Sequence, residues 1–233
     1  MTEQLPDRHG GQTRGRPALA KVGGMSDLKL HAHTRPPPWG VRLGRFLAWL
    51  LGWKAIGGFP NVPKALFIAS PHTSLWDGPI MVILAWSMGI RLSFITKREM
   101  LRFPFKRFVT FFGGIGIDRS RRNDVVAQVA DAFRARDGMY LAVAPDGTRR
   151  ALDHWKSGFY HMALAADVPV ICGYLDYEKK EGGFREIFAL SGDPRVDMER
   201  LREVYAGIPG KFPQMTSRVY LRAEDGVEAP AAR

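Results

Sequence analysis

The strongest constraint on the fold is an alternation of short apolar runs with segments of helical period, which begins near residue 65. Runs such as Ala65–Ser70 are short and apolar, as is typical of strands buried on both faces. Segments such as Asn123–Arg136 place apolar residues at helical spacing. This alternation predicts an α/β fold, a single domain with a largely parallel or mixed sheet flanked by helices. The expected strands are Ala65–Ser70, Leu92–Thr96, Ile115–Asp118, Met139–Ala144, Val168–Tyr174 and Phe184–Leu190, and the expected helices are Gly78–Met88, Arg98–Phe112, Asn123–Arg136, Lys156–Ala166 and Arg195–Tyr205.

The segments that flank this alternation differ in composition. Residues 1–38 are polar and rich in Gly and Arg, so we expect a disordered basic arm that ends at three consecutive prolines. Residues 39–60 carry aromatic and basic residues and are expected to form an amphipathic helix on a membrane surface. The domain itself is expected over residues 61–222, and residues 223–233 are expected to form a frayed tail.

The charge of the chain favours anionic partners. The formal net charge is +11, and residues 1–60 hold nine Lys or Arg against three Asp or Glu. Such a surplus is attracted to an anionic leaflet, while Phe46–Trp53 supplies apolar surface too short to span the hydrocarbon core. The alternative is that this helix packs on the core. The basic, aromatic segment Lys97–Phe112 is a second candidate for membrane or acyl contact, and binding of single-stranded nucleic acid fits it less well.

Neither cysteine nor metal chemistry is expected. The only cysteine, Cys172, lies in an apolar run, so the sequence predicts a buried, inert thiol. His31 and His33 have no supporting Cys or carboxylate cluster, so no metal site or cofactor is predicted.

A His and an Asp follow the first predicted strand of the alternation, in the segment Ser70-Pro71-His72-Thr73-Ser74-Leu75-Trp76-Asp77. Ligands bind at the carboxyl ends of strands in α/β sheets. His72 and Asp77 can meet if the loop curls into the helix, and an imidazole held by a carboxylate can take a proton from a hydroxyl. The alternative is that Asp77 only caps the helix, as a carboxylate near a helix start can.

Two further loops carry groups that suit an anion. Gly113 and Gly114 form a flexible entry to the short strand expected over Ile115–Asp118. Arg119 follows this strand, and its guanidinium could bind a phosphate through two hydrogen bonds. The turn Asp146-Gly147-Thr148-Arg149 offers backbone N–H groups, a hydroxyl and a guanidinium, although it also reads as an ordinary turn.

Four blocks in this order resemble the motifs of the glycerolipid acyltransferases, which include glycerol-3-phosphate and 1-acylglycerol-3-phosphate acyltransferases. They are His72-x4-Asp77, Gly114-x-Gly116-Ile117-Asp118-Arg119, Pro145-Asp146-Gly147-Thr148-Arg149 and Val168-Pro169-Val170, and they cover roughly residues 60–175. Two positions depart from the family pattern, Asp146 where Glu is usual and Pro71 where Asn is frequent.

The resemblance implies an O-acyltransferase that moves an acyl chain from acyl-CoA or acyl-carrier protein to the hydroxyl of a lysophospholipid-like acceptor. His72 would be the general base, oriented by Asp77. Ser74, Gly114, Arg119, Asp146, Gly147, Thr148 and Arg149 would bind substrate. The enzyme would work on the cytoplasmic face of the membrane, as a peripheral or monotopic protein. The alternatives are a non-catalytic lipid-binding relative and a basic nucleic-acid-binding module.

Overall fold

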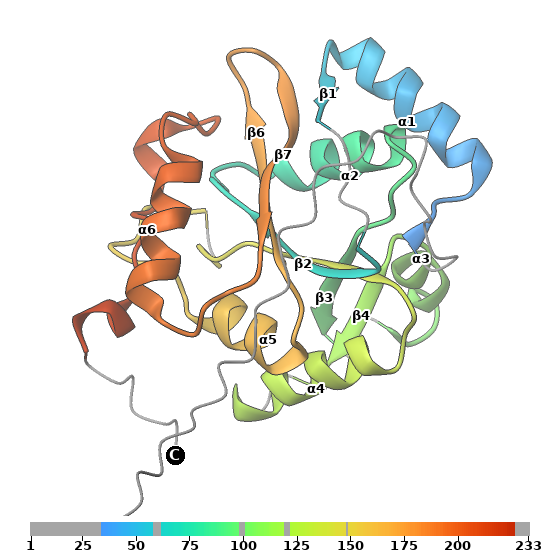
Figure 1. The fold of residues 1–233 in the computed structure, drawn as a ribbon. Helices are drawn as coiled ribbons and strands as arrows, with labels where there is room; N and C mark the ends of the chain where they lie inside the picture. Colours follow the sequence, from blue (N-terminus) through green and yellow to red (C-terminus); the bar gives the residue numbers. More distant parts are fainter. Residues whose placement is uncertain (1–33, 58–61, 98–100, 119–121, 148, 227–233) are drawn as a thin grey trace, which may run out of the picture.

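A computed structural model describes residues 34–57, 62–97, 101–118, 122–147 and 149–226. Over these residues seven strands form one mixed sheet in the order β1-β7-β6-β2-β5-β3-β4, with helices on both sides (Figure 1). The strands are β1 (Lys54–Ile56), β2 (Lys64–Ala69), β3 (Ser93–Lys97), β4 (Gly114–Ile117), β5 (Met139–Val143), β6 (Val170–Asp176) and β7 (Glu181–Phe188). The helices are α1 (Pro38–Leu51), α2 (Asp77–Ser87), α3 (Lys106–Phe111), α4 (Arg122–Arg134), α5 (Gly158–Ala166) and α6 (Pro194–Tyr205), with short 3₁₀ helices at Pro213–Met215 and Arg222–Asp225.

Strand β2 lies at the centre and separates two cores. It pairs in parallel with both β5 and β6. Because side chains alternate along a strand, Leu66 and Ile68 point into the core that also holds residues of α4, α5 and α6. Ala65 and Phe67 point the other way, into the core shared with α2. The uninterrupted apolar run of β2 therefore reflects burial on both faces, as the sequence predicted.

The sheet is parallel except for one pair. Strands β6 and β7 run antiparallel, while β1 lies parallel beside β7. Gly183 lets β1 approach, since a Cβ at this position would lie 1.9 Å from the Ile56 carbonyl oxygen. The mixed α/β sheet expected from the sequence is confirmed.

The predicted helix over residues 39–60 is wrong in its second half. Helix α1 ends at Leu51 because Gly52 takes the left-handed conformation (φ 72°) and its N–H bonds back to the helix. Residues Lys54–Ile56 then form β1, a strand that the sequence did not predict. Trp53, which was expected in the membrane-facing helix, is buried and packs edge-on against Tyr177.

Two other boundaries differ from the predictions. In the described part of the basic segment expected as the helix Arg98–Phe112, the α-helix is limited to α3, which begins after Pro104, a residue with no backbone N–H to donate. The expected frayed tail is ordered over Arg222–Asp225, where Glu224 accepts a bond from the Leu221 N–H and pairs with Arg202 at 2.7 Å. Residues 1–33 of the predicted arm, and 227–233 of the tail, lie outside the described residues.

Helix α1 packs on α2 through its small residues and turns its large apolar residues outward. Gly40, Gly44 and Ala48 are buried, whereas Trp49 is 74% exposed. A Cβ on Gly44 would lie 2.6 Å from the Ser87 backbone nitrogen. The close contact between α1 and α2 therefore depends on the missing side chain at this position.

We predict that Gly44→Ala lowers the free energy of unfolding by about 1–3 kcal/mol because it overpacks the α1–α2 contact. In an open helix position the same change stabilises by up to about 1 kcal/mol. Gly78→Ala in α2 is the matched control, because a Cβ there meets nothing within 4 Å. Urea unfolding of both variants measures the difference, and equal effects at the two sites would contradict the packing.

Candidate active site

The loops that follow β2 and β5 meet at the carboxyl edge of the sheet. The two strands are neighbours and parallel, so their ends, Ala69 and Val143, lie at the same edge. The loop after β2 carries His72 and leads directly into α2, whose first residue is Asp77. The loop after β5 carries Asp146. Parallel pairing thus brings together groups that are more than 70 residues apart in the chain.

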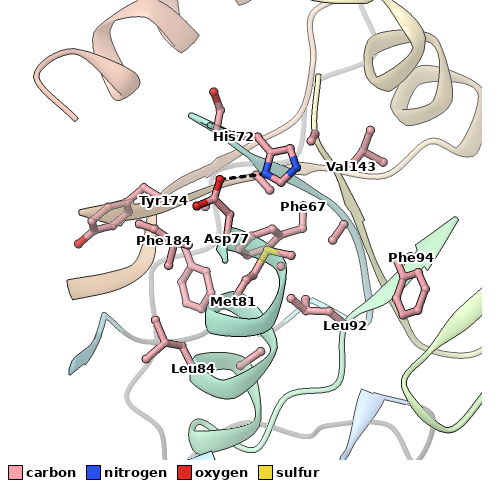
Figure 2. Close-up of a pocket in the computed structure, with 18 of the residues that line it drawn as sticks. Phe67, His72, Asp77, Met81, Leu84, Leu92, Phe94, Val143, Tyr174 and Phe184 are labelled. Atoms are coloured by element: carbon pink, nitrogen blue, oxygen red, sulfur yellow. Dashed lines mark ion pairs between the residues drawn. The ribbon is translucent and has the colours of Figure 1, made fainter. Parts of the chain in front are cut away.

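The loop after β2 curls around the carboxylate of Asp77. Its Oδ2 lies 3.1 Å from the His72 Nδ1 and accepts hydrogen bonds of 2.8 Å from the backbone N–H groups of Thr73 and Ser74. Figure 2 shows the imidazole and the carboxylate facing each other. The four intervening residues therefore form a tight turn, as the pairing of these two side chains requires.

Tyr177 supplies a further donor to the same carboxylate. Its hydroxyl donates a hydrogen bond of 2.5 Å to Oδ1 of Asp77. Burial alone would raise the pKa of Asp77, but hydrogen bonds from His72, Tyr177 and the Ser74 N–H outweigh it and hold this pKa below its ordinary value. Asp77 is therefore a carboxylate at neutral pH. Burial, together with the same bond, raises the pKa of Tyr177.

This arrangement fixes which nitrogen of His72 is free to react. A ring nitrogen bonded to a carboxylate carries the proton, which leaves Nε2 as a base. The His72 side chain is 24% exposed, while that of Asp77 is 7% exposed. The pair can therefore take a proton from a bound hydroxyl, while the carboxylate stays sheltered from water.

Asp146 lies beneath the His72 loop. The His72 N–H donates a 3.0 Å hydrogen bond to its Oδ2, and the residue is only 1% exposed. Burial raises the pKa of Asp146, and the bond from His72 offsets this only in part. In the structure Asp146 accepts a hydrogen bond from the His72 backbone and so helps to position the His72 loop. The sequence analysis had instead assigned it to an anion-binding turn.

An apolar cavity of about 440 Å³ opens beside the catalytic pair. Figure 2 shows α2, with Met81 and Leu84, along one side of it and Phe67, Phe184 and Leu92 around it. Its lining also includes Gly147, whose φ of 61° is left-handed. The cavity thus offers an apolar chamber with an acid–base pair in its wall.

A second hollow, of about 380 Å³, borders the same loop. Its lining combines apolar side chains with two hydroxyl groups and two cations: Thr73, Ser74, Leu75, Trp76, Arg149, Lys211, Phe212 and Met215. The loop after β2 therefore contributes to both spaces, with Ser70–His72 on the apolar cavity and Thr73–Trp76 on the cationic hollow.

The other residues expected at the site are placed as follows. Ser74 is buried in the His72 loop, and Arg149 is exposed and lines the cationic hollow. Gly114 lines neither space, and a Cβ there would lie 2.3 Å from Val109 Cγ1, which gives this glycine a packing role under α3. Arg119 and Thr148 lie outside the described residues.

Two residues at the site were not predicted from the sequence. Tyr177 follows β6, and its position just past a strand end was the available signal. Lys211 lies in a loop after α6 with no such signal. Cys172 is buried, and burial raises its pKa to about 12, in agreement with the inert thiol that was predicted.

Comparisons with known proteins agree on one family. A sequence model described as Acyltransferase matches residues 57–175. The 1-acyl-sn-glycerol-3-phosphate acyltransferase of Limnanthes alba is 27% identical over 140 residues, which cover 57% of this chain and 49% of the relative. The protein of the same name from Salmonella typhimurium is 31% identical over 118 residues, which cover 48% of this chain and 46% of the relative. The chain thus spans about half the length of the curated relatives that it matches.

A solved structure shares the fold. The crystal structure of the 1-acyl-sn-glycerophosphate acyltransferase PlsC from Thermotoga maritima aligns with a TM-score of 0.54 at 17% identity. The alignment covers 73% of this chain and 77% of that one.

The raised pKa of Asp146 predicts a pH-dependent effect of Asp146→Asn. The ordinary pKa of an Asp carboxyl in the unfolded chain is about 3.9. When folding raises this pKa, ionisation of the carboxyl destabilises the folded protein at a pH above the folded pKa. At a pH below the unfolded pKa the carboxyl is protonated in both states, and the destabilisation is absent. The asparagine removes the destabilisation. We therefore expect the free energy of unfolding of the variant, relative to the original chain, to rise as the pH increases above the unfolded value of about 3.9. Asp131→Asn, at an exposed position of α4, controls for the change in net charge. A difference that stays constant across this range would contradict the buried carboxylate.

Proposed function

The chain belongs to the acyltransferase family, and from this premise we propose that it transfers an acyl chain from a thioester to the hydroxyl of a lysophospholipid-like acceptor. The donor would be acyl-CoA or an acyl-carrier protein. One observation carries the proposal: the His72–Asp77 pair lies in the wall of an apolar cavity of about 440 Å³. A base beside an apolar chamber suits a reaction that joins a fatty chain to an alcohol.

The reaction follows from the geometry of the pair. Nε2 of His72 takes the proton of the acceptor hydroxyl as its oxygen attacks the thioester carbonyl carbon. A tetrahedral intermediate forms and collapses, so that an ester C–O bond is made and the C–S bond breaks. The imidazolium then returns its proton to the departing thiolate. Asp77 stabilises the imidazolium, as the carboxylate of a hydrolase triad does, but no protein nucleophile takes part.

Tyr177 acts on this reaction through Asp77. With the N–H groups of Thr73 and Ser74 on one oxygen and Tyr177 on the other, the carboxylate has little freedom to turn away from His72. Tyr177 is therefore a positioning residue. Its loss would affect the orientation of the base more than the binding of substrate.

The apolar cavity suits the acyl chain of the donor. The thioester carbonyl must lie near His72, which places the chain between α2 and the sheet, where Met81, Leu84 and Phe184 line the space. Each methylene buried there contributes about 0.8 kcal/mol. This gives long chains affinity without any polar contact.

A membrane surface would supply the acceptor, and one face of the protein exposes aromatic residues of the kind that bind a membrane surface. The outward face of α1 carries Trp39, Phe46 and Trp49, and Trp39 stacks on Phe111 of α3 at 5.7 Å. The segment that contains α3 adds Phe103, which is 95% exposed, and Phe108. We propose that these two segments together form one interfacial face at the cytoplasmic side of the membrane. Within the described residues, no helix has the length and apolar character needed to span a bilayer.

We predict that His72→Ala lowers the rate of acyl transfer at least about a hundredfold, because the general base is lost. The control is His161→Ala, which removes an exposed imidazole from α5. Tyr177→Phe is expected to lower kcat several-fold with little change in KM, since it loosens only the positioning of Asp77. Thiol release from acyl-CoA with a lysophospholipid acceptor measures all three. Normal turnover of His72→Ala, with its fold intact, would leave a non-catalytic lipid-binding protein as the better description.

For the membrane, we predict that the double variant Phe46→Ser with Trp49→Ser binds anionic vesicles at least about tenfold more weakly. Full burial of such side chains contributes roughly 1.5–3 kcal/mol each. Phe103→Ser with Phe108→Ser should act in the same direction, because both segments belong to one face. Val196→Ser is the control, since Val196 is a 59% exposed apolar residue on α6. Co-sedimentation with vesicles at low and high salt gives the readout. Equal binding by all variants would place the membrane contact elsewhere.

A further inference from the structure

A segment outside the acyltransferase match contacts the catalytic loop. Residues 208–221, which we call the C-terminal strap, follow α6, whereas the match ends at residue 175. Ile208 and Leu221, at the two ends of the strap, are buried in the core that also contains residues of α5 and α6. The strap is therefore anchored on both sides of the stretch that meets the site.

The strap packs on the two residues that flank His72. Gly210 is buried, and a Cβ on it would lie 2.8 Å from the side chain of Thr73 and 3.3 Å from Cγ of Pro71. The Phe212 N–H donates a 3.2 Å hydrogen bond to the hydroxyl of Thr73, which is itself buried. The catalytic loop is therefore held on both sides of His72.

Thr73 connects the strap to the catalytic pair. Its backbone N–H donates a 2.8 Å hydrogen bond to Oδ2 of Asp77, the oxygen that also faces Nδ1 of His72. A shift of Thr73 would move this donor and the adjacent His72 together. Such a shift matters because a displacement of about 1 Å in a catalytic group can lower a rate about a hundredfold.

The strap also reaches the loop after β5. The Ser217 hydroxyl accepts a 3.2 Å hydrogen bond from the Leu152 N–H, and the Arg218 N–H donates a 3.0 Å bond to the Leu152 carbonyl. Ser217 also faces Asp146: burial raises the pKa of this carboxyl, and the His72 N–H and the Ser217 hydroxyl lower it in part. The strap thus contacts both of the loops that meet at the catalytic pair.

We propose that the C-terminal strap belongs to the active site, with Thr73 and Gly210 as positioning residues that set the orientation of His72 and Asp77. This inference rests on the proposed function, because it gives the strap a role in the same reaction. A strap that served only the stability of the fold would change the Tm of a variant and leave the turnover of the folded protein intact.

Gly210→Ala displaces the strap without removing a group from the catalytic pair. The backbone of Gly210 is outside the left-handed region, so it accepts alanine, but the added methyl group must push Thr73 or the strap away. We expect kcat to fall about tenfold, with KM changed less than about twofold. The matched control is Gly158→Ala in α5, where a Cβ would meet only Met162 at 3.7 Å.

Two substitutions of Thr73 test the hydrogen bond from the strap. Thr73→Val removes the hydroxyl that accepts the Phe212 N–H and keeps the shape of the side chain, whereas Thr73→Ser keeps the hydroxyl. We expect kcat of the valine variant to fall about fivefold and the serine variant to retain most of its kcat. Thiol release from palmitoyl-CoA with a lysophosphatidate acceptor gives kcat and KM for every variant.

A second readout does not require turnover. The proton on Nδ1 of His72 gives an NMR signal that reports its hydrogen bond to Asp77 and is identified by its absence from His72→Ala. We expect Gly210→Ala and Thr73→Val to shift or broaden this signal, and Gly158→Ala to leave it unchanged. Circular dichroism and the Tm establish that each variant is folded at the temperature of the measurements, and the Thr73 pair decides the matter if Gly210→Ala does not fold.

The outcomes separate this inference from the proposed function. If transfer by the original chain is normal and folded Gly210→Ala and Thr73→Val keep both kcat and the NMR signal, the proposed function stands and the inference fails. Equal losses of kcat in Thr73→Val and Thr73→Ser would also overturn the inference. If the original chain transfers no acyl group but the signal still depends on Gly210 and Thr73, the inference stands and the proposed function fails.

Discussion

The carboxylate of Asp77 organises the site, because four donors converge on it. His72, Thr73 and Ser74 approach one oxygen and Tyr177 approaches the other. A carboxylate at the first residue of a helix also gains from the positive end of the helix dipole. These interactions outweigh the cost of burying the charge, which explains why the pKa of Asp77 is lowered although the residue is nearly inaccessible. The turn, the orientation of the imidazole and the start of α2 all depend on this one group.

The position of α2 connects the site to the rest of the molecule. One side of the helix packs on the sheet through the core that contains Phe67 and Ala85. Its other side receives α1, which approaches closely because Gly44 has no side chain. As a result, the large apolar residues of α1 face outward while α2 borders the apolar cavity. The same helix pair thus links the proposed membrane face to the acyl site, and the loop at its head separates the acyl cavity from the cationic hollow.

How much of this was predictable depends on the range of the interactions. Local patterns predict the sheet strands from Ala65 onward, helix α2 and the contact between His72 and Asp77. Each of these depends on apolar periodicity or on a strand end, and both can be recognised within a short segment of sequence. Tyr177 and Lys211 reach the site only through the pairing of β6 and the path of the chain after α6, which no local pattern encodes. Strand β1 is a three-residue edge strand that depends on Gly183 in β7. The hydrophobicity of α1 was visible in the sequence, but the face that packs on the protein is the one with the smallest side chains, the reverse of the usual amphipathic arrangement.

The central claim is that the acyl group passes directly from the thioester to the acceptor hydroxyl, with His72 as base and no covalent enzyme intermediate. The most direct measurement incubates the protein with an acyl-CoA, with and without a lysophospholipid acceptor, and follows the intact protein mass, the free thiol and the lipid product. The account predicts no acyl adduct and almost no thiol release without acceptor, and one thiol released per diacyl product once acceptor is added. An acylated protein that forms without acceptor and then passes its acyl group to the acceptor would contradict this account.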